Sequence, residues 1–291
     1  MLDKNKVEFF FFNFFVKLCK VLGLGGTRRL AIVFSFIVFK FLAIRKKVVI
    51  TNLKKAFPEK PGNEIKQIAL SCYKNIFITF FELMYLPNMT DGKISGMIEV
   101  ANPDLITDGV AEGKGLIFLT GHFGSWEIAA LVPSTKFNLP MNLLVQPQRN
   151  PLVTKWLNSA RSRNINNVME AGLSVRKIYE VIKKGELVGI VGDQRGPREG
   201  VRVNFFGINT SLYPGAAAFA LKTKCSVLAS IVIRKPDYNY KVIFEKLSFE
   251  NLPENFEEQI REVNQRFISF IEKYVRMYPE QYFWMHNLWK Y

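Results

Sequence analysis

The segment Thr120–Glu127 carries the residue types best suited to acid–base chemistry in this 291-residue chain. Its sequence is TGHFGSWE, and four residues separate His122 from Glu127. On one continuous helix this spacing would put the two side chains about 140° apart. We therefore expect His122 in a loop and Glu127 in the first turn of a helix, where the two can meet. A carboxylate on one ring nitrogen would fix the tautomer, so that the other nitrogen can accept a proton.

The residues around His122 support this expectation. Gly115–Thr120 (GLIFLT) is a short apolar run, typical of a strand buried in a parallel sheet. Ligands bind at the carboxyl ends of such strands, which is where His122 would lie. Backbone N–H groups at the start of the following helix would be placed to hold a developing oxyanion. The alternative is a structural histidine that caps this helix and pairs with Glu127.

Other catalytic groups are scarce in the sequence. The chain has two histidines, His122 and His286, and three cysteines, none of them in a close pair. It has neither a G-x-S-x-G nucleophile motif nor a metal-ligand spacing, so we expect no metal site and no bound cofactor. The unpaired cysteines indicate a reducing compartment. His286 lies among aromatic residues, and we expect it to be structural.

Apolar strand-like runs and helical patterns alternate along most of the chain. The alternation predicts an α/β fold with a mostly parallel central sheet covered by helices. The expected strands are 97–100, 115–120, 141–145, 186–192, 225–234 and 238–245. The expected helices are 45–56, 63–87, 127–131, 151–161, 175–184, 215–223 and 255–277.

The first 60 residues differ from the remainder in charge and in phenylalanine content. They hold 13 Lys and Arg against three acidic residues, and 11 of the 26 Phe. Basic charge mixed with bulky apolar side chains suits an anionic membrane surface. We therefore divide the chain into a membrane-associating helical segment, 1–60, and a single α/β domain, 61–291. The apolar stretch Leu30–Ile44 would lie in the interface or form a short anchor with Lys40 snorkelling, and ordinary buried helices are the alternative.

Several motifs together resemble the bacterial lipid A biosynthesis acyltransferase family, within the glycerolipid acyltransferase superfamily. GHFGSWE resembles the His-x4-Asp/Glu motif, and its surroundings resemble the family over nearly the whole chain. The matching segments are Asn52-Leu53, Ala56-Phe57-Pro58, Gly113–Glu127, Asn150-Pro151, Arg161–Arg163, Lys183–Glu186, Asp193-Gln194 and Pro279–His286.

This resemblance implies transfer of an acyl group from a thioester to a lipid hydroxyl at the cytoplasmic face of the bacterial inner membrane. His122 would be the general base and Glu127 would hold its ring. The expected substrate-binding residues are Gly124, Arg161, Asp193 and Gln194. The last two, Asp193 and Gln194, would either bind the acceptor or assist the base. The acyl donor would be acyl carrier protein or acyl-CoA, and the acceptor a membrane lipid, above all a lipid A precursor.

Two alternatives remain open from the sequence, and a third is not expected. In the first alternative, the acceptor would be another glycolipid or a lysolipid. Gln146 and Arg195 support this alternative because they depart from the family pattern. A non-catalytic, peripheral lipid-binding protein on the same scaffold is the second alternative. Nucleic-acid binding is not expected, since the basic residues lie among Phe and Leu rather than on a recognition helix.

Overall fold

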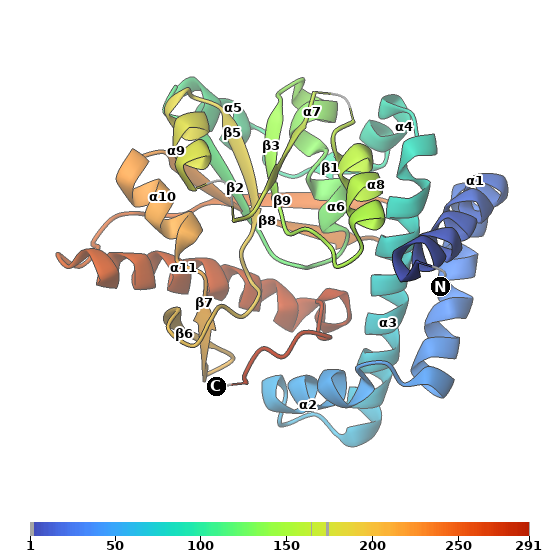
Figure 1. Cartoon of the computed structure of the whole chain (residues 1–291). Coiled ribbons are helices and arrows are strands. Elements are labelled where there is room, and N and C mark those ends of the chain that lie inside the picture. Colours follow the sequence, from blue (N-terminus) through green and yellow to red (C-terminus); the bar gives the residue numbers. More distant parts are fainter. Residues whose placement is uncertain (1–2, 164, 173–174, 291) are drawn as a thin grey trace.

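The computed structural model describes residues 3–163, 165–172 and 175–290. Its centre is a seven-stranded sheet in the order β1-β9-β8-β2-β5-β3-β4 (Figure 1). The five strands from β8 to β4 are parallel, whereas β9 is antiparallel to β8 and parallel to β1. The expected mostly parallel α/β sheet is therefore confirmed. The strands are β1 Ile98–Val100, β2 Leu116–Thr120, β3 Met141–Val145, β4 Asn167–Glu170, β5 Leu187–Val191, β8 Ser226–Arg234 and β9 Tyr240–Lys246.

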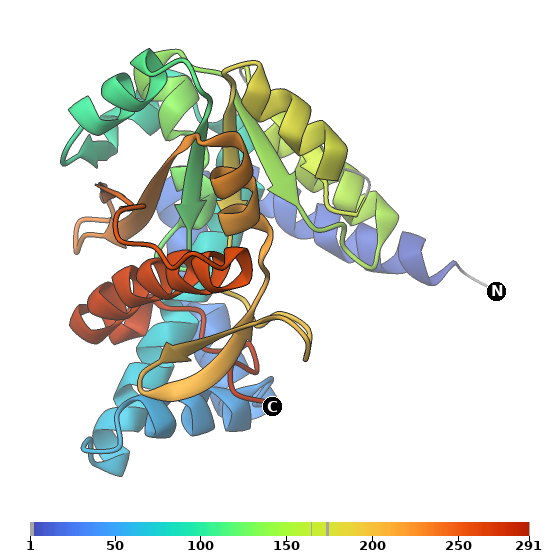
Figure 2. The ribbon, with the colours of Figure 1, turned by 90° about the vertical axis from the view of Figure 1, so that its left-hand side faces the viewer.

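Both faces of the sheet are buried, which explains why β2 is a continuous apolar run. Ile117 and Leu119 belong to the core on one face, and Leu116 and Phe118 to the core on the other. A strand covered on both sides needs apolar residues at every position rather than at alternate ones. Helices therefore pack on both faces of the sheet (Figures 1 and 2).

The helices divide between these two cores. α2, α9, α10, α11 and most of α3 contribute to the first core, and α4, α5, α6, α7 and the end of α3 to the second. The helices are α1 Lys4–Ile37, α2 Lys46–Ala56, α3 Gly62–Tyr85, α4 Asp91–Gly96, α5 Asp104–Ala111, α6 Trp126–Ala129, α7 Val132–Phe137, α8 Pro151–Arg161, α9 Val175–Lys183, α10 Gly215–Thr223 and α11 Phe256–Met277.

Side chains at the helix starts explain several of these boundaries. Asn255 accepts hydrogen bonds from the backbone N–H groups of Glu257 and Glu258, and so begins α11 where the sequence predicts. Asn150 caps α8 in the same way, with a proline at the first helical position. By contrast, α3 begins at Gly62 after Pro61, one residue before the start expected at residue 63.

The N-terminal apolar stretches form one bent element rather than two separate helices. α1 continues into a π-helix, Val38–Leu42, but Gly23 breaks its helical geometry with φ 66° and ψ 176°. The two arms fold back on each other, with the rings of Phe15 and Phe34 5.1 Å apart. Both arms lie beside α3 at the edge of the molecule (Figure 1). Lys4–Leu42 is long and apolar enough to cross a membrane by length and composition.

A small antiparallel hairpin and the C-terminal segment complete the fold beneath α11 (Figure 2). The hairpin consists of β6, Val201–Phe205, and β7, Ile208–Leu212. After α11 the chain returns towards the end of β2, where Phe123 and Tyr282 form an isolated antiparallel bridge. The C-terminal segment thus supports the loop that carries His122.

Candidate active site

The loop 121–125 connects the end of β2 to the start of α6 and carries His122. β2 and β5 are neighbouring parallel strands, with Thr120 opposite Val191. Two residues further along each strand, this register places His122 beside Asp193. Oδ1 of Asp193 lies 2.7 Å from Nδ1 of His122, and Oδ2 accepts the backbone N–H of His122 at 2.9 Å. The adjacent strand therefore supplies the carboxylate that holds the ring.

The charge state of Asp193 follows from this contact. Burial alone would raise the pKa of its carboxyl group, but the charge and hydrogen bonds of His122 and a hydrogen bond from Tyr282 hold that pKa below its usual value. Of the two tautomers of the neutral imidazole, the ionised carboxylate favours the one with its proton on Nδ1, in which Nε2 can accept a proton. The side-chain nitrogen of Gln194 lies 3.2 Å from Nε2. Gln194 thus occupies the side of the ring from which an incoming hydroxyl would approach.

Glu127 lies in the first turn of α6, as expected, but it has a different partner. Its two oxygens bind Arg161 at the end of α8, at 2.6 and 2.9 Å. The expected His122–Glu127 contact is thus replaced by two separate pairs, His122–Asp193 and Glu127–Arg161. The planar guanidinium matches both oxygens of one carboxylate, which gives this pair a fixed geometry. Burial would lower the pKa of Arg161, but Glu127 raises it above its ordinary value, so the arginine is charged.

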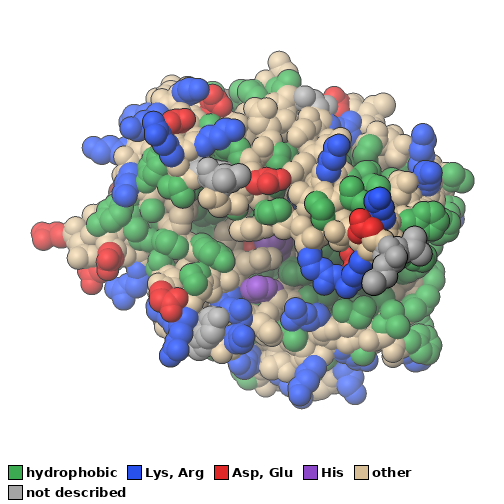
Figure 3. All heavy atoms as spheres, in the orientation of Figure 1, with side chains coloured by type: hydrophobic (Ala, Val, Ile, Leu, Met, Phe, Trp, Pro, Cys, Tyr) green, Lys and Arg blue, Asp and Glu red, His purple; other side chains and the backbone are tan. Residues whose placement is uncertain are grey.

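One cavity brings the two pairs together. His122, Gln194, Glu127 and Arg161 all line a cavity of about 290 Å³. Its remaining walls are largely apolar and come from α6 and from the strands β2, β3, β5, β8 and β9, including Phe118, Met141, Leu143, Val242 and Phe244. The histidines lie in a hollow near the middle of the face shown in Figure 3. A basic nitrogen therefore faces a partly apolar cavity at the carboxyl ends of parallel strands, as the sequence predicts.

Gly124 holds the turn of the loop behind this cavity. Its φ is +56°, and a Cβ there would lie 1.8 Å from the carbonyl oxygen of Val232. Its N–H donates to the carbonyl of Gln281 at 2.8 Å, and its own carbonyl accepts from Thr79 Oγ1 at 2.8 Å. Only glycine suits this position, because the backbone is left-handed and is packed closely against another strand. Gly124 is not among the residues that line the cavity.

Comparison with known proteins places the chain in a family. The profile of the family described as bacterial lipid A biosynthesis acyltransferase matches residues 3–291. The chain belongs to this family. It is therefore an acyltransferase, and the resemblance carried by GHFGSWE and the C-terminal motif is confirmed.

Curated relatives of this acyltransferase have names from the same process. The lipid A biosynthesis palmitoleoyltransferase of Escherichia coli (strain K12) is 24% identical over 252 residues, which cover 86% of this chain and 80% of that protein. The lauroyltransferase of lipid A biosynthesis from the same organism is 25% identical over 256 residues, covering 86% and 81%. A lipid A biosynthesis acyltransferase of Haemophilus influenzae is 25% identical over 243 residues, covering 82% and 73%.

A second cavity of the acyltransferase lies against the other face of the sheet. Its volume is about 810 Å³, and its walls include Leu119, Ile178, Phe219 and Phe267. It shares Gln194 and Gln146 with the first cavity, so the two meet where β3 and β5 end. His286, expected to be structural, lines this second cavity, and its Nε2 is buried without a hydrogen-bond partner among the described residues.

Two features of the acyltransferase site were not found from the sequence. The first is the direct contact of Asp193 with the ring: the sequence names Asp193 as a residue that would assist the base, but the order β2–β5 and the register of the two strands are needed to place it beside His122. The second is the aromatic setting of His122: the rings of Trp126 and Phe283 have centroids 5.1 and 5.8 Å from the imidazole. Within the described ranges, no group of three or more His, Cys, Asp or Glu residues is arranged to hold a metal ion.

Proposed function

We propose that this acyltransferase moves a fatty acyl chain from an acyl thioester to a hydroxyl group of a lipid A precursor, with His122 as the general base. The observation that carries this proposal is the His122–Asp193 pair at an apolar cavity. The names of the curated relatives, all from lipid A biosynthesis, support the choice of acceptor. Another glycolipid or a lysolipid is the alternative acceptor.

The proposed reaction begins when the acceptor hydroxyl displaces the Gln194 side chain from Nε2 of His122. Nε2 takes the hydroxyl proton while the oxygen attacks the thioester carbonyl. Asp193 stabilises the imidazolium that forms and keeps the ring oriented. The tetrahedral intermediate then collapses, its C–S bond breaks, and the leaving thiolate takes the proton from the imidazolium. The products are a lipid ester and the free thiol of acyl carrier protein or coenzyme A, and His122 returns to its neutral state.

The other predicted site residues receive supporting roles in this proposal. Glu127 fixes Arg161, and together they form a charged part of the cavity wall. Arg161 would contact an anionic group of either substrate. The apolar walls around Phe118 and Phe244 would take the acyl chain of the donor. Gly124 would act through the shape of the loop rather than by touching a substrate.

We also propose that α1 lies in the plane of the membrane, at the cytoplasmic face of the inner membrane. Several of its large apolar side chains are exposed on both arms, with Lys and Arg among them: Phe10, Phe11, Phe14, Val21, Val33, Phe36 and Phe41. The start of the first arm is bound to the globular part through Glu8 and Arg149, and the second arm through Arg28 and Glu82. A straight spanning helix would break these contacts. Residues 1–60 would then be the membrane-associating segment and 61–291 the acyltransferase domain.

The test is a transfer assay on the purified full-length protein, with acyl carrier protein and CoA thioesters and a panel of lipid acceptors analysed by mass spectrometry. We expect His122→Ala to abolish transfer and Asp193→Asn to lower kcat about 100-fold or more. Glu127→Gln should cost less, because Glu127 does not contact the ring. Asp237→Asn, in an exposed turn, is the matched carboxylate-to-amide control and should retain full activity.

The results separate the roles assigned to these residues. Unchanged transfer by His122→Ala would remove this histidine from the mechanism. A larger loss in Glu127→Gln than in Asp193→Asn would contradict Asp193 as the orienting carboxylate. Acylation of a lysolipid in preference to lipid A precursors would select the alternative acceptor.

A further inference from the structure

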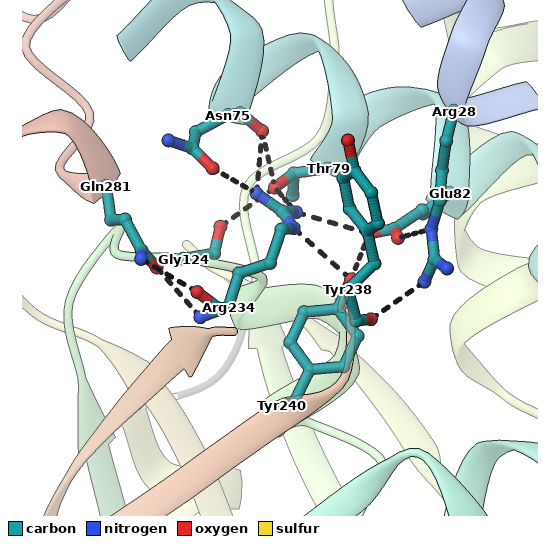
Figure 4. Close-up of polar contacts among 9 residues, drawn as sticks. All are labelled: Arg28, Asn75, Thr79, Glu82, Gly124, Arg234, Tyr238, Tyr240 and Gln281. Atoms are coloured by element: carbon teal, nitrogen blue, oxygen red, sulfur yellow. Dashed lines mark hydrogen bonds and ion pairs between the residues drawn. The ribbon is translucent and has the colours of Figure 1, made fainter. Parts of the chain in front are cut away.

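A buried arginine at the end of β8 is hydrogen-bonded to α3, to β9 and to the C-terminal segment. The side chain of Arg234 is 3% exposed. Its Nη1 donates to the backbone carbonyl and the side-chain oxygen of Asn75, at 3.2 and 2.8 Å, and its Nη2 donates to Thr79 Oγ1 at 2.8 Å and to Glu82 Oε2 at 3.2 Å (Figure 4). All three partners lie on α3, and the guanidinium therefore bridges the sheet and this helix.

Glu82 is the only carboxylate in this group of residues, and two arginines share it. Its Oε1 accepts from Arg28 Nε on α1 at 2.7 Å, while its Oε2 binds Arg234 and the hydroxyl of Tyr240. Burial would lower the pKa of Arg234, but Tyr240 and Glu82 raise it above its ordinary value, so the cation is retained. The group thus places two positive charges, one buried and one partly buried, against one buried negative charge. Such an arrangement contributes little to stability compared with apolar packing, but it fixes side-chain geometry.

Arg234 is connected to both sides of the Gly124 peptide. The side chain of Arg234 donates to Thr79 Oγ1, and the Thr79 hydroxyl in turn donates to the Gly124 carbonyl at 2.8 Å, a shorter contact than the 3.1 Å to the Asn75 carbonyl of its own helix. The backbone of Arg234 is bound by the side chain of Gln281, at 2.8 and 3.0 Å, and the carbonyl of Gln281 accepts the Gly124 N–H. Figure 4 shows these contacts on the two sides of Arg234. Hydrogen bonds from α3 and from the C-terminal segment therefore set the position of Gly124, and Arg234 is bonded to both.

His122 is two residues before Gly124 in the same irregular loop. Its carbonyl accepts the N–H of Phe283, the second residue after Gln281. Asp193 fixes the ring and the backbone N–H of His122. The other loop residues belong to no helix or strand, so their position depends on contacts from α3 and from the C-terminal segment. Errors of about 1 Å in the placement of a reacting group can cost 100-fold in rate. Arg234, Thr79 and Glu82 line neither cavity, as far as the structure describes the walls.

We propose that Arg234, Thr79 and Glu82 are positioning residues that hold the Gly124 turn, and through it the imidazole of His122, in the geometry required for proton transfer. This inference rests on the proposed role of His122 as the base. The three residues touch no substrate, so they act on the chemical step and not on binding.

The sharpest test removes a single hydroxyl group. Thr79→Val keeps the shape of the side chain and loses the hydrogen bond to Gly124, and we expect kcat to fall about 10- to 100-fold with KM within about twofold. Thr79→Ser keeps the hydroxyl and should restore kcat. Thr210→Val is the matched control, because Thr210 is also buried and donates to a carbonyl, that of Leu288, away from the loop. It should lower the melting temperature and leave kcat within about twofold.

His122→Ala is measured in parallel, so that the two proposals fail separately. Full kcat in folded Thr79→Val beside an inactive His122→Ala would overturn the positioning role alone. An equal loss of kcat in Thr79→Val and Thr210→Val would also overturn it, since the effect would then follow stability. Full transfer by His122→Ala would overturn the base and its positioning together. Should the valine variant not fold, Thr79→Ala replaces it with the same expected and opposing results.

Discussion

At the scale of single residues, the site depends on which carboxylate pairs with which basic side chain. His122 and Asp193 form one pair and Glu127 and Arg161 another, and all but Asp193 line the first cavity. The spacing of His122 and Glu127 permits a contact but does not require one. Asp193 has the advantage because β2 and β5 are in register, which leaves the Glu127 carboxylate to the two-pronged guanidinium of Arg161.

His286 gives a prediction for the pH dependence of stability. Burial, together with the nearby charge of Arg195, lowers the pKa of His286 from its ordinary value near 6.5. The unfolded chain therefore binds a proton at this residue at a higher pH than the folded chain does. The free energy of unfolding should fall as the pH drops below about 6.5, until the folded-state pKa is reached.

The measurement compares melting temperatures between pH 7.5 and pH 5 for the wild type and His286→Gln in detergent. We expect the variant to lose less stability on acidification than the wild type. His122→Gln removes the other histidine and serves as the control. An identical pH dependence in the wild type and His286→Gln would show that His286 is not a source of this effect.

At the scale of elements, the sequence predicts the long and strongly patterned segments well. β2, β5 and β8 are apolar runs, and α11 has both a cap and a regular periodicity. The segments that were missed are short or atypical. β4 is a four-residue strand with a polar residue at each end, α5 contains a glycine, and the turn between β6 and β7 has Phe206 in a left-handed conformation that usually takes Asn or Gly.

The bend of α1 leads to a prediction at this scale. Gly23 has φ 66° and ψ 176°, a conformation that only glycine adopts readily, although nothing lies within 4 Å of a Cβ placed there. Gly23→Ala should therefore destabilise the folded arms by about 1–3 kcal/mol through backbone strain alone. Gly25 is helical and equally open, so Gly25→Ala should stabilise the helix by about 0.5–1 kcal/mol.

Thermal unfolding of the two variants and the wild type, in the same detergent, tests this bend. Opposite shifts of the melting temperature are expected. Equal shifts for Gly23→Ala and Gly25→Ala would mean that the two arms are not folded back at Gly23 in solution.

At the scale of the whole molecule, the site and the apolar N-terminal helix belong to one connected structure. Arg28 on α1 binds Glu82, Glu82 binds Arg234, and Arg234 is bonded through Thr79 to the His122 loop. The sequence identifies the basic and apolar character of residues 1–60 but not these contacts, because they join residues more than 50 and 150 positions apart. The N-terminal apolar helix and the His122 loop are therefore held in a fixed relation, which suits the proposed transfer of an acyl chain to a membrane lipid.

The in-plane placement of α1 predicts which positions are accessible from each side of the membrane. The three native cysteines are buried, so single cysteines placed at Lys6, Leu22 and Lys183 can be labelled selectively. With both arms lying at the cytoplasmic surface, a membrane-impermeant maleimide should label none of the three in intact spheroplasts. Permeabilised membranes should show labelling at Lys183→Cys, which serves as the control for the cytoplasmic domain. Labelling of Lys6→Cys from outside would instead indicate that the first arm spans the bilayer, and labelling of Leu22→Cys that both arms cross it as a hairpin.

Each arm has about 19 residues and would extend about 28 Å, close to the thickness of the hydrocarbon core, so length alone does not decide between these arrangements. The contacts of Glu8 and Arg28 with the globular domain favour the proposed in-plane arrangement, because a helix that crosses the bilayer would leave both partners behind.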